Sequence, residues 1–194
     1  MDRLLVATHN AGKLREIAEA LRGHVGQVVG QGEVAGAPGP AEESADSYRG
    51  NALLKARALH RVSGQATMAD DSGLEVEALG GRPGLHSSRY GETDGGRISR
   101  LLEELHGVES ERRGARFVCT IALVLPDGEQ HFFEGVCAGR ILESPRGTGG
   151  FGFDPVFLVE ESGRAMAELS IEEKNRVSHR ARALSSMRDW LGRS

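Results

Sequence analysis

The chain has 194 residues, 39% of them hydrophobic and 27% charged, so we expect one globular domain over residues 1–194 with a sizeable core. Lys and Arg number 24 against 28 Asp and Glu, which argues against a broad basic surface for a nucleic acid polymer or an anionic membrane. The sequence contains neither an apolar run of the ~20 residues that a membrane span needs nor a signal peptide, so we expect a cytoplasmic protein. Cys119 and Cys137 lie in apolar segments without C-x-x-C spacing, which favours buried reduced thiols.

A buried strand is expected near the start of the chain, where Leu4–Ala7 is apolar. After a polar loop over residues 8–13, apolar residues recur at helical spacing and predict a helix: Leu14, Ile17, Ala18 and Leu21. The unpaired N–H groups at a helix N-terminus can bind phosphate, and Lys13 would add a positive charge there. A capped helix with a surface lysine fits the same residues.

Residues 30–46 are rich in Gly, Pro, Ala and Glu and predict a long, mobile loop, which inside a compact domain is more often functional than idle. A second helix is expected from about Ser47 to Val62. Its buried face should carry four residues: Tyr48, Ala52, Ala56 and Leu59. Asn51 and Lys55, four residues apart, then share a polar edge of this helix.

The apolar run Ala66–Ala69 leads into Asp70-Asp71-Ser72-Gly73, which we expect to form a glycine turn. On its own this motif favours a solvated turn in which one aspartate caps a backbone group. Two adjacent carboxylates repel each other, however, and a divalent cation would cancel the repulsion. Mg²⁺ prefers oxygen ligands and is usually shared between one or two carboxylates and a substrate phosphate.

Leu74 and Val76 alternate with glutamates and predict a half-exposed strand. A polar, irregular segment is expected over residues 86–90. A third helix then follows, with an apolar face that belongs to the core: Ile98, Leu101, Leu102 and Leu105. The segment Phe117–Leu125 reads as a strand buried on both faces, and a Pro-Asp-Gly turn leads it back into Gln130–Ile141 as an antiparallel hairpin.

Glycines dominate residues 147–155, ahead of a short strand over residues 156–159. Glycine allows a close backbone approach to a ligand, and Phe151 and Phe153 offer rings on which a base could stack. A packed corner explains the same residues. Ser170–Glu173 forms a capping box that opens the C-terminal segment, and a final helix follows with four apolar residues on one face: Ala181, Leu184, Met187 and Leu191.

Five motifs in this order resemble the inosine triphosphate pyrophosphatase family. They span nearly the whole chain: Thr8-x-Asn10-x-x-Lys13, Asn51-Ala52 with Lys55-Ala56, Ala69-Asp70-Asp71-Ser72-Gly73-Leu74, Gly149–Pro155, and Glu173-Lys174 with Ser178-His179-Arg180. The resemblance implies Mg²⁺-dependent hydrolysis of dITP, ITP or XTP to the monophosphate and pyrophosphate, which removes non-standard purines from the nucleotide pool. It also implies a homodimer and an α/β fold, with an elongated mixed β-sheet flanked by helices and two lobes with the active-site cleft between them. The hairpin independently predicts the mixed sheet.

The resemblance also implies roles for individual residues. Asp71 corresponds to the catalytic carboxylate and a metal ligand, and the other metal candidates are Glu42, Glu43 and Asp70. Contacts to the phosphates are implied for the first loop and for Ser72: Thr8, His9, Asn10, Ala11, Gly12, Lys13 and Ser72. The nucleotide and base pocket corresponds to Phe151, Gly152, Phe153, Asp154, Lys174, His179 and Arg180. Related sequences often carry glutamate where this chain has Gly50, so a ligand lost there would come from Glu42, Glu43, Asp46 or Asp70.

The chemistry of a triphosphate fits these assignments. Its negative charges call for cations, and we expect four to converge on it: Lys13, Lys55, Lys174 and Arg180. Asp71 would orient or deprotonate the attacking water at the metal. A donor from His179 or Arg180 to the oxygen at position 6 of the base would reject ATP, whereas the sequence shows no means of rejecting GTP.

Two other hypotheses stay open at this point. The first is a pyrophosphatase for other modified or pyrimidine nucleotides. The second is a nucleotide-sensing module without turnover, against which the paired carboxylates argue, since they would repel a triphosphate in the absence of a metal.

Overall fold

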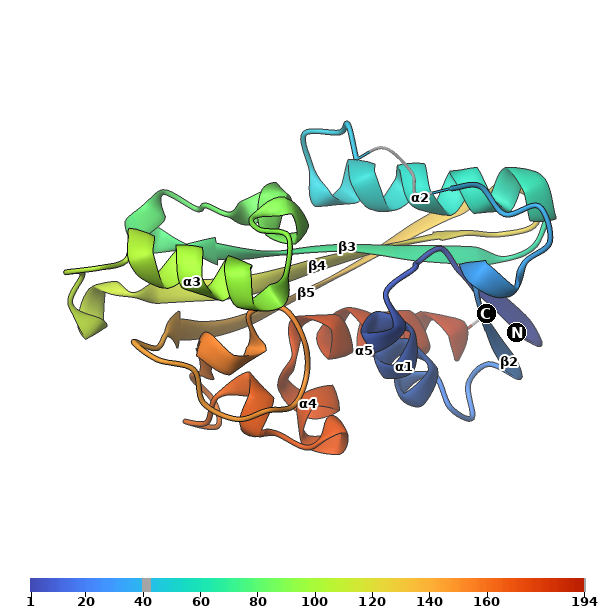
Figure 1. The fold of residues 1–194 in the computed structure, drawn as a ribbon. Coiled ribbons are helices and arrows are strands. Elements are labelled where there is room, and N and C mark those ends of the chain that lie inside the picture. The colour runs from blue at the N-terminus through green and yellow to red at the C-terminus, as the bar shows by residue number, and fades with distance from the viewer. Residues whose placement is uncertain (40–42, 194) are drawn as a thin grey trace. The chain divides into compact units, whose positions relative to one another are not determined.

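The structure, a computed structural model, describes residues 1–39 and 43–193. Its helices are α1 (Ala11–Ala20), α2 (Tyr48–Ser63), α3 (Asp94–Glu104), α4 (Ile171–Val177) and α5 (His179–Leu191). Its strands are β1 (Arg3–Val6), β2 (Gln27–Gly30), β3 (Thr67–Val76), β4 (Gly114–Val124), β5 (Gln130–Ile141) and β6 (Phe157–Val159). The strands form one sheet in the order β2-β1-β3-β4-β5-β6 (Figure 1). Because β1 pairs parallel with β2 and β3 while β5 and β6 pair antiparallel, the predicted mixed α/β sheet is confirmed.

The chain divides into two compact units. Unit 1 comprises Met1–Asp71, Cys119–Gly135 and Arg180–Ser194, and unit 2 comprises Ser72–Val118 and Val136–His179. The three strands β3, β4 and β5 contribute residues to both units. Two compact units agree with the expected two lobes, and the cleft stays a prediction.

In unit 1, both faces of the sheet are covered. Successive side chains of a strand point to opposite faces: Leu4 and Val6 of β1 belong to one buried cluster, and Leu5 and the following Ala7 belong to another. Helices α1 and α5 contribute to the first cluster and α2 to the second, on opposite sides of the strands (Figure 1). The strand β4 is buried at every residue from Cys119 to Val124, which confirms the expectation of a strand covered on both faces.

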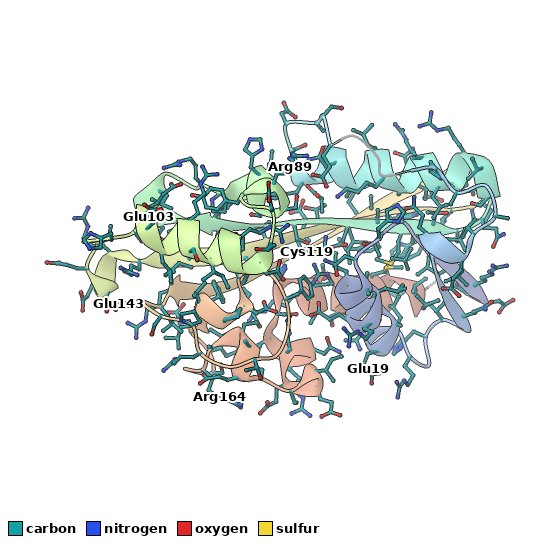
Figure 2. All side chains as sticks on the ribbon, in the orientation of Figure 1. Glu19, Arg89, Glu103, Cys119, Glu143 and Arg164 are labelled. Atoms are coloured by element: carbon teal, nitrogen blue, oxygen red, sulfur yellow. The ribbon has the colours of Figure 1, made fainter. Side chains whose placement is uncertain are left out.

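Unit 2 has a core of its own. Residues of α3, the second half of β3 and the aromatic side chains of Phe117 and Phe157 form one buried cluster, with ring centroids 4.5 Å apart. The charged side chains of Glu103, Glu143 and Arg164 are exposed (Figure 2). Within the part of the chain that the structure describes, no helix is both long and apolar enough to cross a membrane.

The prediction of a turn at Asp70–Gly73 is wrong. These residues lie inside β3, an uninterrupted ten-residue strand from Thr67 to Val76. The strand pairs with β1 at Thr67 and Met68 and is hydrogen-bonded to β4 in the sheet, and this pairing outweighs the local turn preference of Asp-Ser-Gly. The motif is therefore presented on a rigid element of the sheet.

Other departures are smaller. The strand β2 has only two apolar residues, Val28 and Val29, and periodicity did not reveal it. The segment expected to be irregular at residues 86–90 is a 3₁₀ helix, Gly84–Arg89. On α1 the predicted Ala18 is exposed, whereas Glu16 is buried. An ion pair with the buried Arg180 explains the burial of Glu16.

Several predicted elements are confirmed closely. The helix α2 begins after Ser47, whose side chain accepts a hydrogen bond from the N–H of Gly50, and the capping box at Ser170 opens α4. The hairpin turn closes where the N–H of Leu125 donates to the carbonyl of Glu129 at 2.9 Å. Cys119 and Cys137 are buried thiols, as expected.

Candidate active site

The loop between β1 and α1 is folded by its own side chains. Thr8 Oγ1 accepts a hydrogen bond from the N–H of Asn10 at 3.1 Å, and Asn10 Oδ1 accepts one from the N–H of Lys13 at 3.0 Å. The second bond caps the helix. His9 and Ala11 are exposed and Gly12 is half-buried. The predicted phosphate loop therefore presents a capped helix N-terminus and the ammonium group of Lys13.

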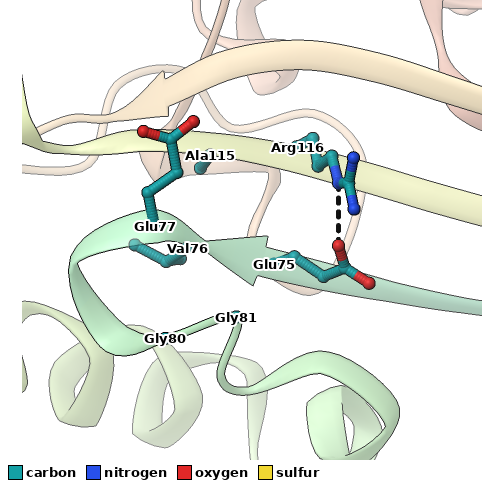
Figure 3. A pocket seen from close by; sticks show the side chains of 7 residues that line it. All are labelled: Glu75, Val76, Glu77, Gly80, Gly81, Ala115 and Arg116. Carbon is teal, nitrogen blue, oxygen red and sulfur yellow. Dashed lines mark hydrogen bonds and ion pairs between the residues drawn. The ribbon is translucent and has the colours of Figure 1, made fainter.

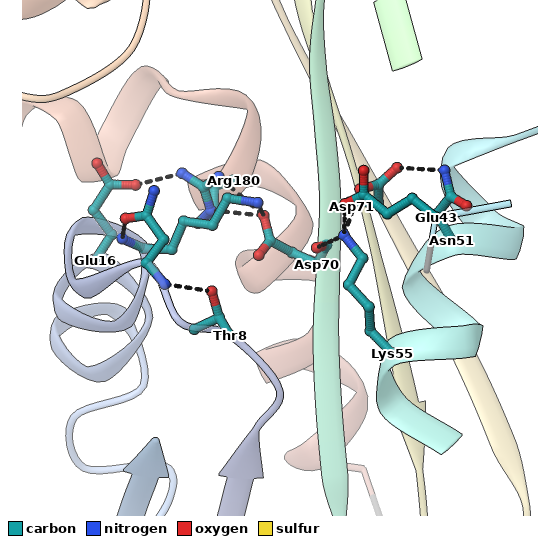
Figure 4. Close-up of polar contacts among 10 residues, drawn as sticks. Thr8, Glu16, Glu43, Asn51, Lys55, Asp70, Asp71 and Arg180 are labelled. Atoms are coloured by element: carbon teal, nitrogen blue, oxygen red, sulfur yellow. Dashed lines mark hydrogen bonds and ion pairs between the residues drawn. The ribbon is translucent and has the colours of Figure 1, made fainter. Parts of the chain in front are cut away.

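Asp70 and Asp71 point to opposite sides of β3 (Figure 4). Asp70 faces the same way as Met68, toward the cluster that α1 and α5 cover, and Asp71 faces the same way as Ala69, toward the cluster that α2 covers. The two adjacent carboxylates therefore have separate surroundings, because successive side chains of a strand point to opposite faces.

Asp70 lies in a network of buried ion pairs. Its Oδ2 accepts hydrogen bonds from Arg180 Nε at 3.1 Å and Nη2 at 2.9 Å, and Lys13 Nζ lies 3.0 Å from the same oxygen. Arg180 Nη1 also donates to Glu16 Oε2 at 2.5 Å. The three side chains of Arg180, Asp70 and Glu16 are at most 7% exposed.

Arg180 keeps its charge in these surroundings. Burial acts to lower the pKa of Arg180, but the carboxylates of Asp70 and Glu16 outweigh it and raise the pKa above its usual value. Two carboxylates and two cations, Arg180 and Lys13, then compensate one another. Such a neutral set is costly to disrupt because any single loss leaves a buried charge.

Asp71 belongs to a different network, formed with side chains of α2. Its Oδ1 is 2.6 Å from Lys55 Nζ, and its Oδ2 accepts a hydrogen bond from Asn51 Nδ2 at 3.3 Å. Lys55 Nζ also contacts Glu43 Oε1 at 2.7 Å and the backbone carbonyl of Asp70 at 3.4 Å. Figure 4 shows these side chains arranged around the lysine.

The pKa values of this pair are both shifted. Burial raises the pKa of Asp71, the charge of Lys55 opposes that shift, and the result is a pKa above the ordinary value. Burial lowers the pKa of Lys55, but its pairing with Asp71 and Glu43 outweighs it, so the pKa of Lys55 is raised. A carboxylate with a raised pKa accepts a proton more readily, which suits a general base.

The donors around Lys55 suit a cation of higher charge as well. Asp71 and Glu43 direct hard carboxylate oxygens at one point, and Mg²⁺ commonly takes one or two carboxylates with the remaining ligands from water and phosphate. Across residues 1–39 and 43–193, no three His, Cys, Asp or Glu side chains gather as a metal site. Glu42, one of the predicted ligands, lies outside the described residues. The chemistry of the two described donors fits Mg²⁺.

In unit 2, the glycine-rich loop of residues 147–155 is held by hydrogen bonds to the Asp154 side chain. Asp154 Oδ2 accepts hydrogen bonds from the N–H of Phe151 at 2.8 Å and from Lys174 Nζ at 2.5 Å. Lys174 Nζ also lies 4.7 Å from the centroid of the Phe151 ring. A Cβ at Gly150, where φ is +73°, would lie 2.0 Å from Asp154 Oδ2, so the loop needs glycine at this position.

The comparisons with known proteins cover the whole chain. The sequence model of the Ham1 family matches residues 4–190. The chain belongs to the Ham1 family. A protein named dITP/XTP pyrophosphatase from Geobacter sulfurreducens is 49% identical over 99% of this chain and 98% of its own length. One with the same name from Bacillus subtilis is 42% identical over 98% of both. The structure of a HAM1 protein from Coxiella burnetii, 38% identical, superimposes with a TM-score of 0.88 over 100% of both chains.

Membership of the Ham1 family confirms the resemblance that five separate motifs indicated. The structure brings together several of the predicted residues in unit 1, on the two sides of β3: Lys13, Glu43, Lys55, Asp70, Asp71 and Arg180. Lys174 belongs to unit 2 and pairs with Asp154. The residue roles implied by the resemblance stay predictions.

The predicted base contacts of this Ham1 protein differ in burial. Phe153 is 4% exposed, and its ring lies 6.3 Å from that of Tyr90 in a T-shaped arrangement, so it is part of the core. Phe151 is half-buried. His179 stacks on Phe117 with ring centroids 4.7 Å apart and an interplanar angle of 14°. Ser72, the residue after Asp71 on β3, is half-buried.

Some polar residues that hydrogen-bond to predicted site residues were not identified as site residues from the sequence. Glu16 binds Arg180, Asn51 binds Asp71, and Asp94 Oδ2 accepts a hydrogen bond from the N–H of Gly152 at 2.7 Å. Helical spacing could have indicated the first two, since Glu16 is three residues after Lys13 and Asn51 four before Lys55. No local signal relates Asp94 to Gly152.

A separate hollow of unit 2 contains none of the predicted residues. It has a volume of about 350 Å³ and is lined by Glu75, Val76, Glu77, Gly80, Gly81, Ala115 and Arg116. Glu75 Oε2 pairs with Arg116 Nε across it at 2.7 Å (Figure 3). The ion pair is solvent-exposed, and the hollow offers no counterpart to the partly buried charges around Asp71.

Proposed function

We propose that this protein hydrolyses the non-standard purine nucleoside triphosphates dITP, ITP and XTP to the monophosphate and pyrophosphate. The reaction would remove these nucleotides from the pool and prevent their incorporation into DNA and RNA. The observation that carries the proposal is the group formed by the buried Asp71 and the partly buried Lys55 and Glu43 in a chain of the Ham1 family. The names of the relatives from Geobacter sulfurreducens and Bacillus subtilis support the substrate class.

In the proposed mechanism, Asp71 accepts the proton of the attacking water. Its raised pKa supports this role, because a base titrating closer to neutral pH transfers protons more effectively. Lys55 and Lys13 stabilise negative charge on the phosphates. The loop from Thr8 to Lys13 supplies backbone N–H groups at the start of α1, and Ser72 is a further phosphate contact by resemblance.

We propose Mg²⁺ as the cofactor, with Asp71 and Glu43 as ligands among the described residues. When bound, the ion supplies charge neutralisation on the phosphates and their leaving group. Glu42 and Asp70 are further candidates by resemblance. Asp70 is already engaged by Arg180 and Lys13, so we rank it behind Glu43.

For the nucleotide and its base, we propose contacts from Phe151, Gly152, Phe153, Asp154, Lys174 and His179. The supporting observation is that Asp154 and Lys174 hold the loop carrying Phe151 in one conformation. Arg180 donates hydrogen bonds to Asp70 and Glu16. We therefore propose that Arg180 orients Asp70 and does not contact the base.

We further propose a single catalytic domain over residues 1–194 that forms a cytoplasmic homodimer, an expectation drawn from the resemblance and the composition. Sedimentation velocity tests the dimer directly: a species near twice 20.8 kDa is expected, and a monomer across the working concentration range would remove this part of the proposal.

The proposed reaction is tested by incubating the purified protein with ITP, dITP, XTP, GTP and ATP, with Mg²⁺ or with a chelator. Pyrophosphate and orthophosphate are assayed separately. We expect pyrophosphate from ITP, dITP and XTP, little from ATP, and none with the chelator. Orthophosphate as the product would instead indicate attack at the terminal phosphate, and tight binding of ITP without product would indicate a sensing module.

A further inference from the structure

Asn51 joins two parts of the candidate site. This side chain on α2 is 1% exposed. Its Oδ1 accepts a hydrogen bond from the backbone N–H of Ala45 at 3.0 Å, and its Nδ2 donates to Asp71 Oδ2 at 3.3 Å. An amide is suited to this position because it carries an acceptor and a donor on one planar group. The two bonds also fix which end of the amide is oxygen, since the opposite orientation would place donor against donor.

Asp71 is thereby held at both of its oxygens. Lys55 binds Oδ1 and Asn51 binds Oδ2, so the plane of the carboxylate has one preferred orientation. Through its hydrogen bond with Ala45, the same amide also holds the segment of residues 43–46. This segment contains Glu43, whose carboxylate pairs with Lys55. Small displacements of a reacting group cost large factors in rate, so a residue that orients both carboxylates matters for turnover.

Gly50 allows this segment to approach α2 closely. A Cβ at residue 50 would lie 2.6 Å from the Cβ of Ala45 and 3.1 Å from Ser47 Oγ. A Cβ–Cβ contact of that length does not occur, so any side chain at residue 50 displaces Ala45. Gly50 lies in the first turn of α2, and the close approach of Ala45 explains why glycine is suited to this position.

We propose that Asn51 is a positioning residue, which holds the Asp71 carboxylate and the segment carrying Glu43 in one arrangement around Lys55, and that Gly50 makes this arrangement possible. The proposal rests on the proposed pyrophosphatase function for its effect on turnover. Its effect on the segment of residues 43–46 is independent of that function.

Three variants separate the two bonds. Asn51→Asp keeps an acceptor for the Ala45 N–H and loses the donor to Asp71. Gly50→Ala keeps the donor to Asp71 and displaces Ala45. Asn51→Ala loses both bonds. Gln27→Glu, which adds one negative charge at an exposed position of β2, is the matched control for charge.

The first measurement is hydrogen exchange of the Ala45 amide, followed by NMR in the protein without metal or nucleotide. Exchange at Ala45 should accelerate about tenfold or more in Asn51→Ala and Gly50→Ala, as expected for a lost hydrogen bond of about 1.5 kcal/mol. It should stay near the wild-type rate in Asn51→Asp and in Gln27→Glu. Unchanged exchange in Asn51→Ala would overturn the anchoring of the segment.

The second measurement is the steady-state rate of pyrophosphate release from ITP, with melting temperatures recorded on the same samples. We expect kcat to fall about tenfold or more in Asn51→Asp and Asn51→Ala, with KM changed much less, because positioning acts on the chemical step. Gly50→Ala should also lose kcat while its melting temperature stays close to wild type. A wild-type kcat in Asn51→Asp, or losses of kcat that only follow the melting temperature, would overturn the positioning role.

The two hypotheses fail in distinguishable ways. If the wild type releases no pyrophosphate from any nucleotide, the proposed function fails, and exchange at Ala45 alone decides whether Asn51 anchors the segment. If the wild type is active and all three variants behave like Gln27→Glu, the positioning role fails and the function stands.

Discussion

Asp70 and Asp71 are neighbours in the chain and almost equally buried, at 2% and 5% exposure, yet they have different surroundings. Around Asp70, the carboxylates of Asp70 and Glu16 meet the cations Arg180 and Lys13. Around Asp71, two carboxylates share the ammonium group of Lys55. Balanced charge suits a structural ion network, whereas an excess of carboxylate leaves a group that can take a proton or a metal ion.

If this contrast is correct, Asp71→Asn has the largest effect on activity and a small one on stability. We expect pyrophosphate release to fall by about 10²- to 10⁴-fold, the usual contribution of a general base. Asp189→Asn, a change of the same kind at an exposed position of α5, serves as the control. A variant that keeps more than a tenth of wild-type activity would remove Asp71 from the catalytic role.

Arg180→Met should show the opposite pattern. It leaves two buried carboxylates without their guanidinium partner, and removing one member of a buried ion pair costs about 3–5 kcal/mol. Urea unfolding measures this loss. Arg22→Met, shortly after α1 in the chain, is the control, because the Arg22 side chain is 76% exposed and exposed ion pairs contribute little. Equal stability of the two variants would show that burial of Arg180 has no energetic consequence.

Glu16→Gln should weaken the same network less. The variant keeps the shape of the side chain and removes one charge, while Asp70 still pairs with Arg180, so we expect a loss of about 1–3 kcal/mol in unfolding free energy. With Mg²⁺ and ITP present, kcat should change by no more than a few-fold. A loss of kcat as large as that of Asp71→Asn would place Glu16 with the reacting groups and remove the contrast between the two sides of β3.

The smallest expected effect is on the titration of Asp71. Burial raises its pKa, Lys55 opposes the shift, and the charge of Glu43 adds to it. Glu43→Gln should therefore lower the pKa of Asp71, which ¹³C NMR of the side-chain carboxyl carbons measures in the metal-free protein. A pKa that rises would show that Glu43 acts mainly by holding Lys55 in place.

The same shift has a consequence for stability with a defined sign. The folded-state pKa of Asp71 lies above its ordinary value of 3.8. Between pH 3.8 and the folded-state pKa, the folded protein therefore binds more protons than the unfolded chain. This contribution to stability declines as the pH rises through that window. Glu43→Gln should bring the folded-state pKa of Asp71 closer to its ordinary value and so narrow this pH range. The decline of the unfolding free energy with pH should therefore be smaller in this variant, as unfolding experiments at several pH values would show.

Features that depend on neighbours along the chain could be predicted from the sequence. Spacing of three or four residues indicated α1, α2, α3 and α5, side-chain caps indicated where α4 starts, and a Pro-Asp-Gly turn indicated the hairpin of β4 and β5. The shared edge of Asn51 and Lys55 on α2 was also readable, because both lie within about one turn of a helix. Five ordered motifs were sufficient for the family.

The partner of each charged residue depends on how distant segments of the chain come together in the fold. Arg180 is 110 residues from Asp70 and 164 from Glu16 in sequence, and no local pattern relates them. The residues expected to form a turn, Asp70–Gly73, lie inside β3, which pairs with β1 at Thr67 and Met68 and is hydrogen-bonded to β4. Once Asp70 and Asp71 lie in a strand, alternation sends them to opposite faces. The helices that cover those faces, α1 and α5 on one and α2 on the other, then give identical neighbours different chemistry.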